Sequence, residues 1–342
     1  MIVPNAPLLD RRGFLAGTGL ALGAAALADA PGVARAAAPA APPLAFIMNS
    51  GGATVGIIDM ATRRVLRDAP TLREPSHWAL TPDHARLLVC DAGGNGLFTF
   101  DPRTGAELAH RVFPDPYQIG FSPDGKLFVV NCLRLNFVDI YSADLRLLAR
   151  LRVGSMPSHL GFSPDSRWSF NSMQQSGTVV AIDLVTRRPR WTAQVGPTAA
   201  GVLWHNNQVL CCVMGTHDVV ALDPATGRIV RRVETGVGPH NLFLTPDKAT
   251  LYVTNRVGGS IAALDPATLK VRRVYNLGYA GPDDMGMAPD GKLWVALRFR
   301  EQVGVLDPAS GRLETIDVGR SPHGIFLNTT LAQTGYVTAE QL

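Results

Sequence analysis

Charged residues make up only 18% of the 342-residue sequence, and there are just four cysteines. No Cys-x-x-Cys pair occurs, so thioredoxin chemistry and c-type haem attachment lack their motifs. The sequence also lacks a Gly-x-Ser-x-Gly elbow, a Walker loop, a His-Glu-x-x-His motif and a dinucleotide fingerprint. Serine-hydrolase, NTPase and metalloprotease functions therefore have no local support. The cysteines lie in or next to apolar runs, which is typical of small buried side chains.

The first residues have the pattern of an export signal. Arg11 and Arg12 precede Phe14-Leu15, a stretch over 13–28 is rich in glycine and alanine, and small residues follow around 34–38. This resembles a twin-arginine (Tat) signal. We predict a signal peptide over residues 1–36, an Ala/Pro-rich linker to about 43, and a periplasmic mature protein. The alternatives are an ordinary secretory signal and an uncleaved anchor. The stretch is short and weakly apolar, so the mature chain is expected to have no transmembrane span.

Two markers repeat along the rest of the chain with one period, which indicates one supersecondary unit copied seven times. The first marker is a proline, found 40 to 43 residues after the previous one: Pro75, Pro116, Pro157, Pro197, Pro239, Pro282 and Pro322. The second is an aspartate, replaced once by tyrosine: Asp59, Asp101, Tyr141, Asp183, Asp223, Asp265 and Asp307. A closed array of such units counts as one domain, which we place at residues 44–342.

Each repeat contains four short β-strands. In the repeat that begins at Pro239, apolar and β-branched runs cover 241–245, 250–255, 260–265 and 270–276, separated by turn residues. No helical period appears. Four strands joined by tight turns form an antiparallel meander, and seven such sheets arranged radially bury one another's faces. The sequence thus predicts an all-β, seven-bladed propeller of four-stranded antiparallel blades. An open β-solenoid is the rival.

Ring closure is also predicted from the sequence. An inner strand over 323–327 lies near the end of the chain, whereas the first complete strands, 44–49 and 54–59, have no inner strand before them. Joining these segments completes the seventh blade. The segment 335–338 also falls near the phase of a second strand. We favour 44–49 in that position and expect the tail after Thr330 to lie over the outside.

The motif Tyr252-Val253-Thr254-Asn255, the Pro-Asp-Gly turns and the Asp-Pro-Ala-Thr-Gly turns resemble the YVTN-type repeat family, which includes YncE-like exported proteins. The resemblance covers about residues 44–330 and implies the propeller fold. Members of the family include proteins with no established activity. Related propellers serve as lactonases, as streptogramin lyases or as the d1-haem domain of nitrite reductase, and the fold does not choose among these functions.

Ligands of propellers usually bind where the loops that begin the inner strands meet at the central channel. In this chain, these positions are the two residues after each repeated proline. The first residue of each pair is Ser76, Tyr117, Ser158, Thr198, His240, Asp283 or His323. The second is His77, Gln118, His159, Ala199, Asn241, Asp284 or Gly324. Adjacent residues of a strand point to opposite faces, so His77 and His159 need not join the first set.

His240, Asp283 and His323 share one phase in consecutive repeats and are expected to converge. Imidazole with carboxylate suits a divalent metal such as Zn, Mn or Fe, and His77 or Asp284 could complete the set. The same residues could act as a general acid and base pair. Alternatively, Pro-His is a feature of the repeat, and each imidazole bonds only a neighbouring loop.

The leading functional hypothesis is an exported, non-catalytic scaffold. Its channel mouth would bind a small molecule or a periplasmic protein through Tyr117, His77, His159 and the His240–Asp283–His323 set. The runner-up is a metal-dependent lactonase or lyase that uses this cluster, and a third is a d1-haem-like cofactor carrier with an axial histidine. The net charge of +4 is too small to indicate nucleic acid. Arginines on the predicted outer strands protect sheet edges from aggregation, and no aromatic platform accompanies them.

Overall fold

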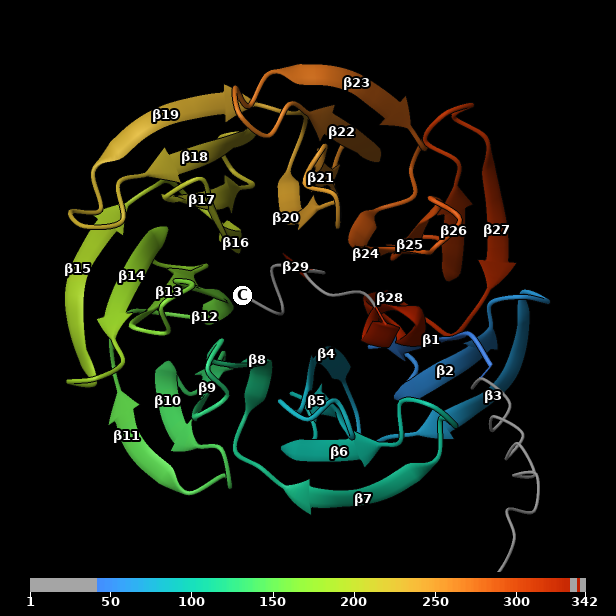
Figure 1. Ribbon diagram of the computed structural model, residues 1–342, viewed down its shortest axis with the longest axis horizontal. Coiled ribbons are helices and arrows are strands. Elements are labelled where there is room, and N and C mark those ends of the chain that lie inside the picture. Colours follow the sequence, from blue (N-terminus) through green and yellow to red (C-terminus); the bar gives the residue numbers. More distant parts are fainter. Residues whose placement is uncertain (1–41, 333–336, 339–342) are drawn as a thin grey trace, which may run out of the picture. The chain divides into compact units, whose positions relative to one another are not determined.

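The computed structural model describes residues 42–332 and 337–338, so the predicted export signal and most of the linker lie outside the described part. Seven antiparallel sheets surround a common axis, as Figure 1 shows. The prediction of a seven-bladed propeller is confirmed. No described helix is both long enough and apolar enough to cross a membrane.

The four main strands of each sheet follow one another from the axis outward. The closing blade contains β28 (Pro322–Leu327), β1 (Leu44–Asn49), β2 (Thr54–Asp59) and β3 (Arg64–Pro70). The next two contain β4 (Pro75–Leu80), β5 (Leu87–Asp91), β6 (Gly96–Phe100) and β7 (Glu107–Val112), then β8 (Pro116–Phe121), β9 (Leu127–Cys132), β10 (Phe137–Ser142) and β11 (Leu147–Leu151).

The fourth and fifth blades contain β12 (Pro157–Phe162), β13 (Trp168–Met173), β14 (Thr178–Asp183) and β15 (Arg188–Gln194), then β16 (Ala199–His205), β17 (Gln208–Val213), β18 (Asp218–Leu222) and β19 (Ile229–Glu234). The last two contain β20 (Pro239–Leu244), β21 (Leu251–Asn255), β22 (Ser260–Leu264) and β23 (Val271–Asn276), then β24 (Pro282–Met287), β25 (Leu293–Leu297), β26 (Gln302–Leu306) and β27 (Leu313–Asp317).

The two repeated markers have distinct structural roles. Most of the repeated prolines begin an inner strand, which suits a residue that cannot donate to the sheet ladder. The repeated aspartates lie at or just after the end of the third strand and cap the turn that follows. Asp59 Oδ1, for example, accepts hydrogen bonds from the backbone N–H groups of Ala61 (2.8 Å) and Thr62 (3.1 Å).

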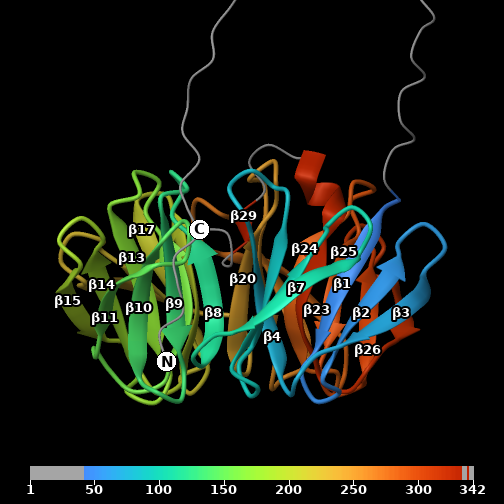
Figure 2. The ribbon, with the colours of Figure 1, turned by 90° about the horizontal axis from the view of Figure 1, so that it is seen from below.

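The two faces of the ring carry different loops. We call one the proline face, because it carries the loops before the inner strands, such as 71–74 and 235–238. The other is the turn face, which carries the turns between the first and second strands, such as 81–86 and 245–250. The 3₁₀ helix η1 (Asn328–Ala332) follows β28 on the turn face, and Figure 2 shows it from the side.

The hydrophobic core is divided into seven clusters, each between two neighbouring sheets. Outer strands such as β7 are exposed, whereas inner and second strands are almost wholly buried. The four cysteines are buried in these layers. Because one blade's buried face is completed only by the next blade, the sheets stabilise one another around the ring.

Ring closure follows the prediction, with one correction. Strand β1 pairs with β28 and β2, so residues 44–49 fill the second position of the closing blade. The tail does not lie over the outside as expected. Strand β29 (Val337–Thr338) pairs with Phe243 and Leu244 of the innermost strand β20, so it lies on the axial side of that blade. The inner edge of β20 offers backbone N–H and C=O groups with which a further strand can pair.

We expect Phe326→Ala to lower the free energy of unfolding by about 3–5 kcal/mol, as measured by urea denaturation. The Phe326 ring is fully buried, with its centroid 5.6 Å from that of Phe46 and 4.8 Å from that of Trp78, across the joint between the closing blade and its neighbour. The control is Leu108→Ala on β7, where the side chain is 54% exposed, with an expected change within about 0.5 kcal/mol. Equal effects of the two substitutions would contradict this account of closure.

Candidate functional site

A β-bulge in the inner strands places both residues after the repeated proline near the axis. In β20, Pro239 pairs with Asn255 and Asn241 pairs with Thr254, so two steps on the inner strand match one step on its partner. The same extra residue occurs after Pro75 and Pro157. A bulge re-aims side chains that simple alternation would send to opposite faces. The expectation based on alternation is therefore wrong for His77 and His159.

All six predicted site residues lie together at the axis. The ring centroid of His77 is 4.5 Å from that of His323 and 4.9 Å from that of Tyr117, and the His159 ring is 4.9 Å from the His240 ring. The four imidazoles are at most 3% exposed. At this level the axis is filled by packed rings. We call the four histidines with Tyr117 the imidazole cluster.

Asp283 connects the imidazole cluster to two arginines of the proline face. Its Oδ1 lies 2.7 Å from His240 Nδ1 and accepts a hydrogen bond from Arg256 Nη2 at 2.6 Å. Its Oδ2 accepts a hydrogen bond from Arg298 Nη1 at 3.0 Å and lies 3.7 Å from His323 Nε2. Asp283 is fully buried, whereas the side chains of Arg256 and Arg298 keep 16% and 25% of their surface exposed.

The contacts of His240 define its tautomer. Arg256 also donates to His240 Nε2. A guanidinium is only a donor, so Nε2 must be the acceptor and the neutral ring carries its proton on Nδ1, which faces Asp283. His240 Nδ1 lies close to Asp283 but does not have the geometry of a hydrogen bond, and His159 Nε2 and both nitrogens of His323 also have no hydrogen-bond partner among the described residues.

The charges of the site follow from burial. Burial lowers the pKa of His77 and of His240 to about 4, and it holds the pKa values of His159 and His323 well below the usual range. Burial alone would raise the pKa of Asp283, but Arg256 and the two nearby imidazoles hold it well below its usual value. At neutral pH the site therefore has the guanidinium charges of Arg256 and Arg298, which contact the Asp283 carboxylate, and the buried Asp284 carboxylate also lies close to His77.

Hydrogen bonds from two arginines compete with metal binding at the His240–Asp283–His323 set. One ligand atom from each of His240, Asp283 and His323 lies within 4.8 Å of the others, close enough to surround one ion. Both oxygens of Asp283 already accept hydrogen bonds from arginines. A cation would have to displace these guanidinium groups and overcome their repulsion. The metal site stays a prediction, while the geometry favours an anion.

Asp284 has a different role from Asp283. Its Oδ1 accepts a hydrogen bond from Asn241 Nδ2 at 3.1 Å, and its Oδ2 accepts one from the backbone N–H of Ile325 at 3.1 Å. These partners belong to the two neighbouring inner strands. Asp284 thus ties three blades together rather than completing the His240–Asp283–His323 set.

The fifth blade departs from the predicted alignment. In this blade Ala199, not Pro197, pairs with the end of the second strand, and Val202 pairs with Cys211. The axial positions are therefore Ala200 and Gly201 instead of Thr198 and Ala199. A Cβ on Gly201 would lie only 2.7 Å from the His240 backbone oxygen, so this strand approaches its neighbour too closely for a side chain there.

Arg256 and Arg298 were missed by the sequence analysis. Each directly follows the end of a second strand, in consecutive repeats and in one phase, 42 residues apart. That spacing matches the distance of 43 residues between His240 and Asp283, so the same repeat argument could have found them. They were overlooked because arginine was considered only on the outer strands.

The comparisons with known proteins agree with this architecture. The family described as YNCE-like beta-propeller matches residues 1–332. A comparison with curated proteins finds no match.

Several solved structures share the fold. The dihydro-heme d1 dehydrogenase NirN, in complex with DHE, is 13% identical with a TM-score of 0.64, over 86% of this chain and 77% of that one. The periplasmic gluconolactonase of Pseudomonas aeruginosa is 21% identical with a TM-score of 0.67, over 83% and 98%. The hydrazine synthase of Kuenenia stuttgartiensis is 18% identical with a TM-score of 0.61, over 72% and 87%. At these identities the likeness concerns the fold alone.

We expect the free energy of unfolding to fall as the pH drops from about 6.5 to about 4. The unfolded chain binds protons at its histidines below their ordinary pKa of 6.5, whereas folded His77 stays neutral until about pH 4. One such group accounts for roughly 3 kcal/mol over this window. Urea unfolding of the protein and of His77→Gln at several pH values measures the difference, and the variant should lose about that much pH dependence.

The matched control for this experiment is His110→Gln. The His110 side chain lies on the outer strand β7 and is 58% exposed, so its replacement should leave the pH dependence unchanged. A His77→Gln protein with the same pH dependence as the parent would contradict the assignment of a neutral, buried imidazole.

Proposed function

We propose that this protein binds a small anionic ligand, first of all a carboxylate, on its proline face. The chain belongs to the YNCE-like β-propeller family, and the proposal starts from that fold. The main observation behind the proposal is that two partly exposed guanidinium groups, those of Arg256 and Arg298, share one buried carboxylate. Four neutral imidazoles lie next to them. The exposed parts of these two guanidinium groups would attract an anion into a setting of low dielectric.

Arg256 and Arg298 are the groups proposed to bind the ligand. A guanidinium offers five donors in a planar fork, and only some of them are used on Asp283. Arg256 Nε has no hydrogen-bond partner among the described residues. Asp283 would hold both arginines in place, so that little side-chain entropy is lost when an anion binds.

A second function is hydrolysis of a sugar lactone. The imidazole nitrogen His159 Nε2 is neutral and without a hydrogen-bond partner among the described residues, so it can accept a proton, but burial holds the pKa of His159 well below the usual range and makes it a weak general base. Water would add across the ring ester, and the arginines would stabilise the oxyanion and then the carboxylate product. The shared fold with a periplasmic gluconolactonase is compatible with this chemistry.

We expect purified protein to bind gluconate measurably in isothermal titration calorimetry, and its uncharged counterpart glucitol far more weakly. Arg298→Gln should weaken gluconate binding about 10-fold to 100-fold, because a hydrogen bond to a charged group contributes about 1.5–3 kcal/mol. The matched control is Arg300→Gln, two residues on, whose Nε donates to the Tyr279 carbonyl in the loop before β24 at 3.3 Å. The affinity of the Arg300→Gln variant for gluconate should stay within about twofold of that of the parent protein. Equal binding of glucitol and gluconate would refute the proposal.

The same preparation separates the other hypotheses. Gluconolactone hydrolysis that is lost in His159→Gln would identify an enzyme rather than a binding protein. Stoichiometric metal that is lost in His240→Ala would support the metal site. A Soret band in the visible spectrum would support a haem carrier, the function suggested by the name of the d1 dehydrogenase.

We also propose that the protein is exported to the periplasm by the Tat pathway, on the evidence of Arg11-Arg12 and the weakly apolar stretch after them. Fusion of residues 1–43 to a fluorescent protein should give periplasmic fluorescence. Substitution of both arginines by lysine should keep the fusion in the cytoplasm, although the charge is unchanged. Export of the lysine variant at the parental rate would instead indicate an ordinary secretory signal.

A further inference from the structure

The fifth blade differs from the others on the turn face. Strands β16 and β17 are joined by only two residues, Asn206 and Asn207, both with positive φ (47° and 56°), as a type I′ hairpin requires. Other blades have five or six residues at this point, such as 163–167 and 245–250. The inner strand β16 therefore extends one residue further than β12 or β20, to His205.

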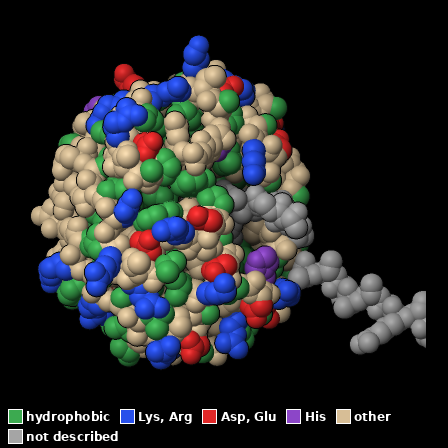
Figure 3. All heavy atoms as spheres, turned by 60° about the vertical axis from the view of Figure 1, so that its left-hand side comes forward, with side chains coloured by type: hydrophobic (Ala, Val, Ile, Leu, Met, Phe, Trp, Pro, Cys, Tyr) green, Lys and Arg blue, Asp and Glu red, His purple; other side chains and the backbone are tan. Residues whose placement is uncertain are grey.

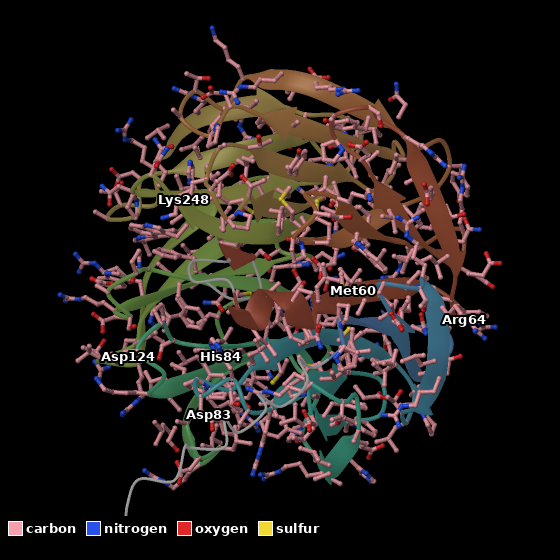
Figure 4. All side chains as sticks on the ribbon, turned by 45° about the vertical axis from the view of Figure 1, so that its right-hand side comes forward. Met60, Arg64, Asp83, His84, Asp124 and Lys248 are labelled. Carbon is pink, nitrogen blue, oxygen red and sulfur yellow. The ribbon has the colours of Figure 1, made fainter. Side chains whose placement is uncertain are left out.

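The short turn is flanked by two adjoining hollows. One has a volume of about 800 Å³ and lies toward the β20 blade, where its lining includes Lys248 and Arg272. The other, of about 490 Å³, lies toward the β12 blade, where its lining includes Trp168 and Arg190. Both are lined by Pro164, Trp204 and Asn207, so they form one groove across three blades. Figure 4 labels Lys248, which stands at one end of this groove. These volumes are in the range of small-molecule sites.

The groove combines aromatic faces with hydrogen-bond donors that have no partner. The indoles of Trp168 and Trp204 are half-buried, and the Trp204 ring stacks on Phe170 beneath it, with centroids 5.8 Å apart. Within the described residues, neither the Lys248 ammonium nor the Arg190 guanidinium makes a hydrogen bond or ion pair. A rigid, half-exposed indole gives a large apolar contact at a low entropic cost.

The acidic side chains of the two hollows have different partners. Asp265 pairs with Arg272 and caps its own turn by accepting from the backbone N–H groups of Ala267 and Thr268. Asp165 accepts from two neutral donors, the Ser163 hydroxyl and the backbone N–H of Arg167, and so keeps its negative charge. Lys248 therefore shares its hollow with an acidic group that is already paired, whereas Arg190 shares its hollow with the Asp165 carboxylate.

We propose that this groove binds an acidic oligosaccharide, such as a short chain of uronic acids. The apolar C–H faces of the sugar rings would pack on Trp168 and Trp204, and their hydroxyl groups would bond the Asn207 amide and the indole N–H groups. Carboxylates on successive sugars would pair with Lys248 and Arg190. The groove lies on the turn face, whereas Arg256 and Arg298 lie on the proline face, so the two sites are separate.

A single-stranded nucleic acid shares part of this chemistry but fits the surface less well. Nucleic-acid binders need a continuous basic track, because every nucleotide carries a phosphate. In Figure 3, basic side chains are spread over the surface and interleaved with acidic and apolar ones. Two isolated cations beside two tryptophans match a ligand with fewer charges and more hydroxyl groups.

The test uses calorimetric titration of the full-length mature protein with trigalacturonate, uncharged cellotriose and oligothymidylate. The proposal expects saturable binding of trigalacturonate and a loss of affinity of about tenfold or more in the double variant Lys248→Gln, Arg190→Gln. Both side chains are exposed, so this variant should fold normally. Trp204→Leu should also weaken binding, with its folding checked by urea denaturation.

Two controls make the result specific. Lys126→Gln changes another exposed cation of the turn face, with a side chain 79% exposed, and should keep the parental affinity. Because trigalacturonate carries carboxylates that the proposed site on the proline face could also bind, each titration is repeated with saturating gluconate present, so that the binding that remains belongs to the groove whether or not the carboxylate site exists. Equal binding of cellotriose, unchanged affinity of the double variant, or tighter binding of oligothymidylate would each overturn the proposal.

Discussion

The structure depends on closure of the ring. A four-stranded sheet of this size cannot bury both of its faces, and each hydrophobic cluster is shared by two neighbouring sheets. Pairing of β28 with β1, from opposite ends of the chain, completes the last of these layers. The Trp78 indole reinforces the joint by donating to the Ile325 carbonyl at 2.9 Å. Without this closure, two blades would each expose an apolar face to water.

Closure also creates the site, because it brings the inner strands of non-neighbouring repeats to one axis. His77 and His323 are 246 residues apart in sequence, yet their rings are in contact. Seven inner strands leave too little room at this level for water around four imidazoles, so the rings lose their hydration and stay neutral. The buried Asp283 carboxylate remains charged because two guanidinium groups reach it from the proline face.

The two proposed sites follow from departures from the repeat rather than from the repeat itself. On the proline face, arginine occurs after the second strand in only two consecutive blades, and the charge is therefore confined to one side of the axis. On the turn face, one blade replaces a longer turn by a two-residue hairpin and exposes Trp204. A symmetrical scaffold fixes the backbone, and local exceptions give it binding chemistry.

Much of the fold was predictable because it is written in local, repeated patterns. Prolines at one period, aspartates that cap the same turn and alternating apolar runs required nothing beyond short-range chemistry, and they predicted the blade number and strand positions to within about two residues. The participation of residues 44–49 in the closing blade was predictable for the same reason. The shift in the fifth blade was not, because its register is set by a two-residue turn whose effect appears only when strands pair.

The sequence by itself determined the blade number, the strand order and, outside the fifth blade, the pairs of residues that lie near the axis. Only the tertiary structure decided how those residues combine. Bulges in the inner strands turned both His77 and His159 inward, against simple alternation, and the approach of neighbouring blades placed Arg256 and Arg298 on Asp283. The reason is physical: strand periodicity is a local property of the backbone, whereas burial, charge pairing and the path of the tail along β20 depend on distances between blades that no single repeat encodes.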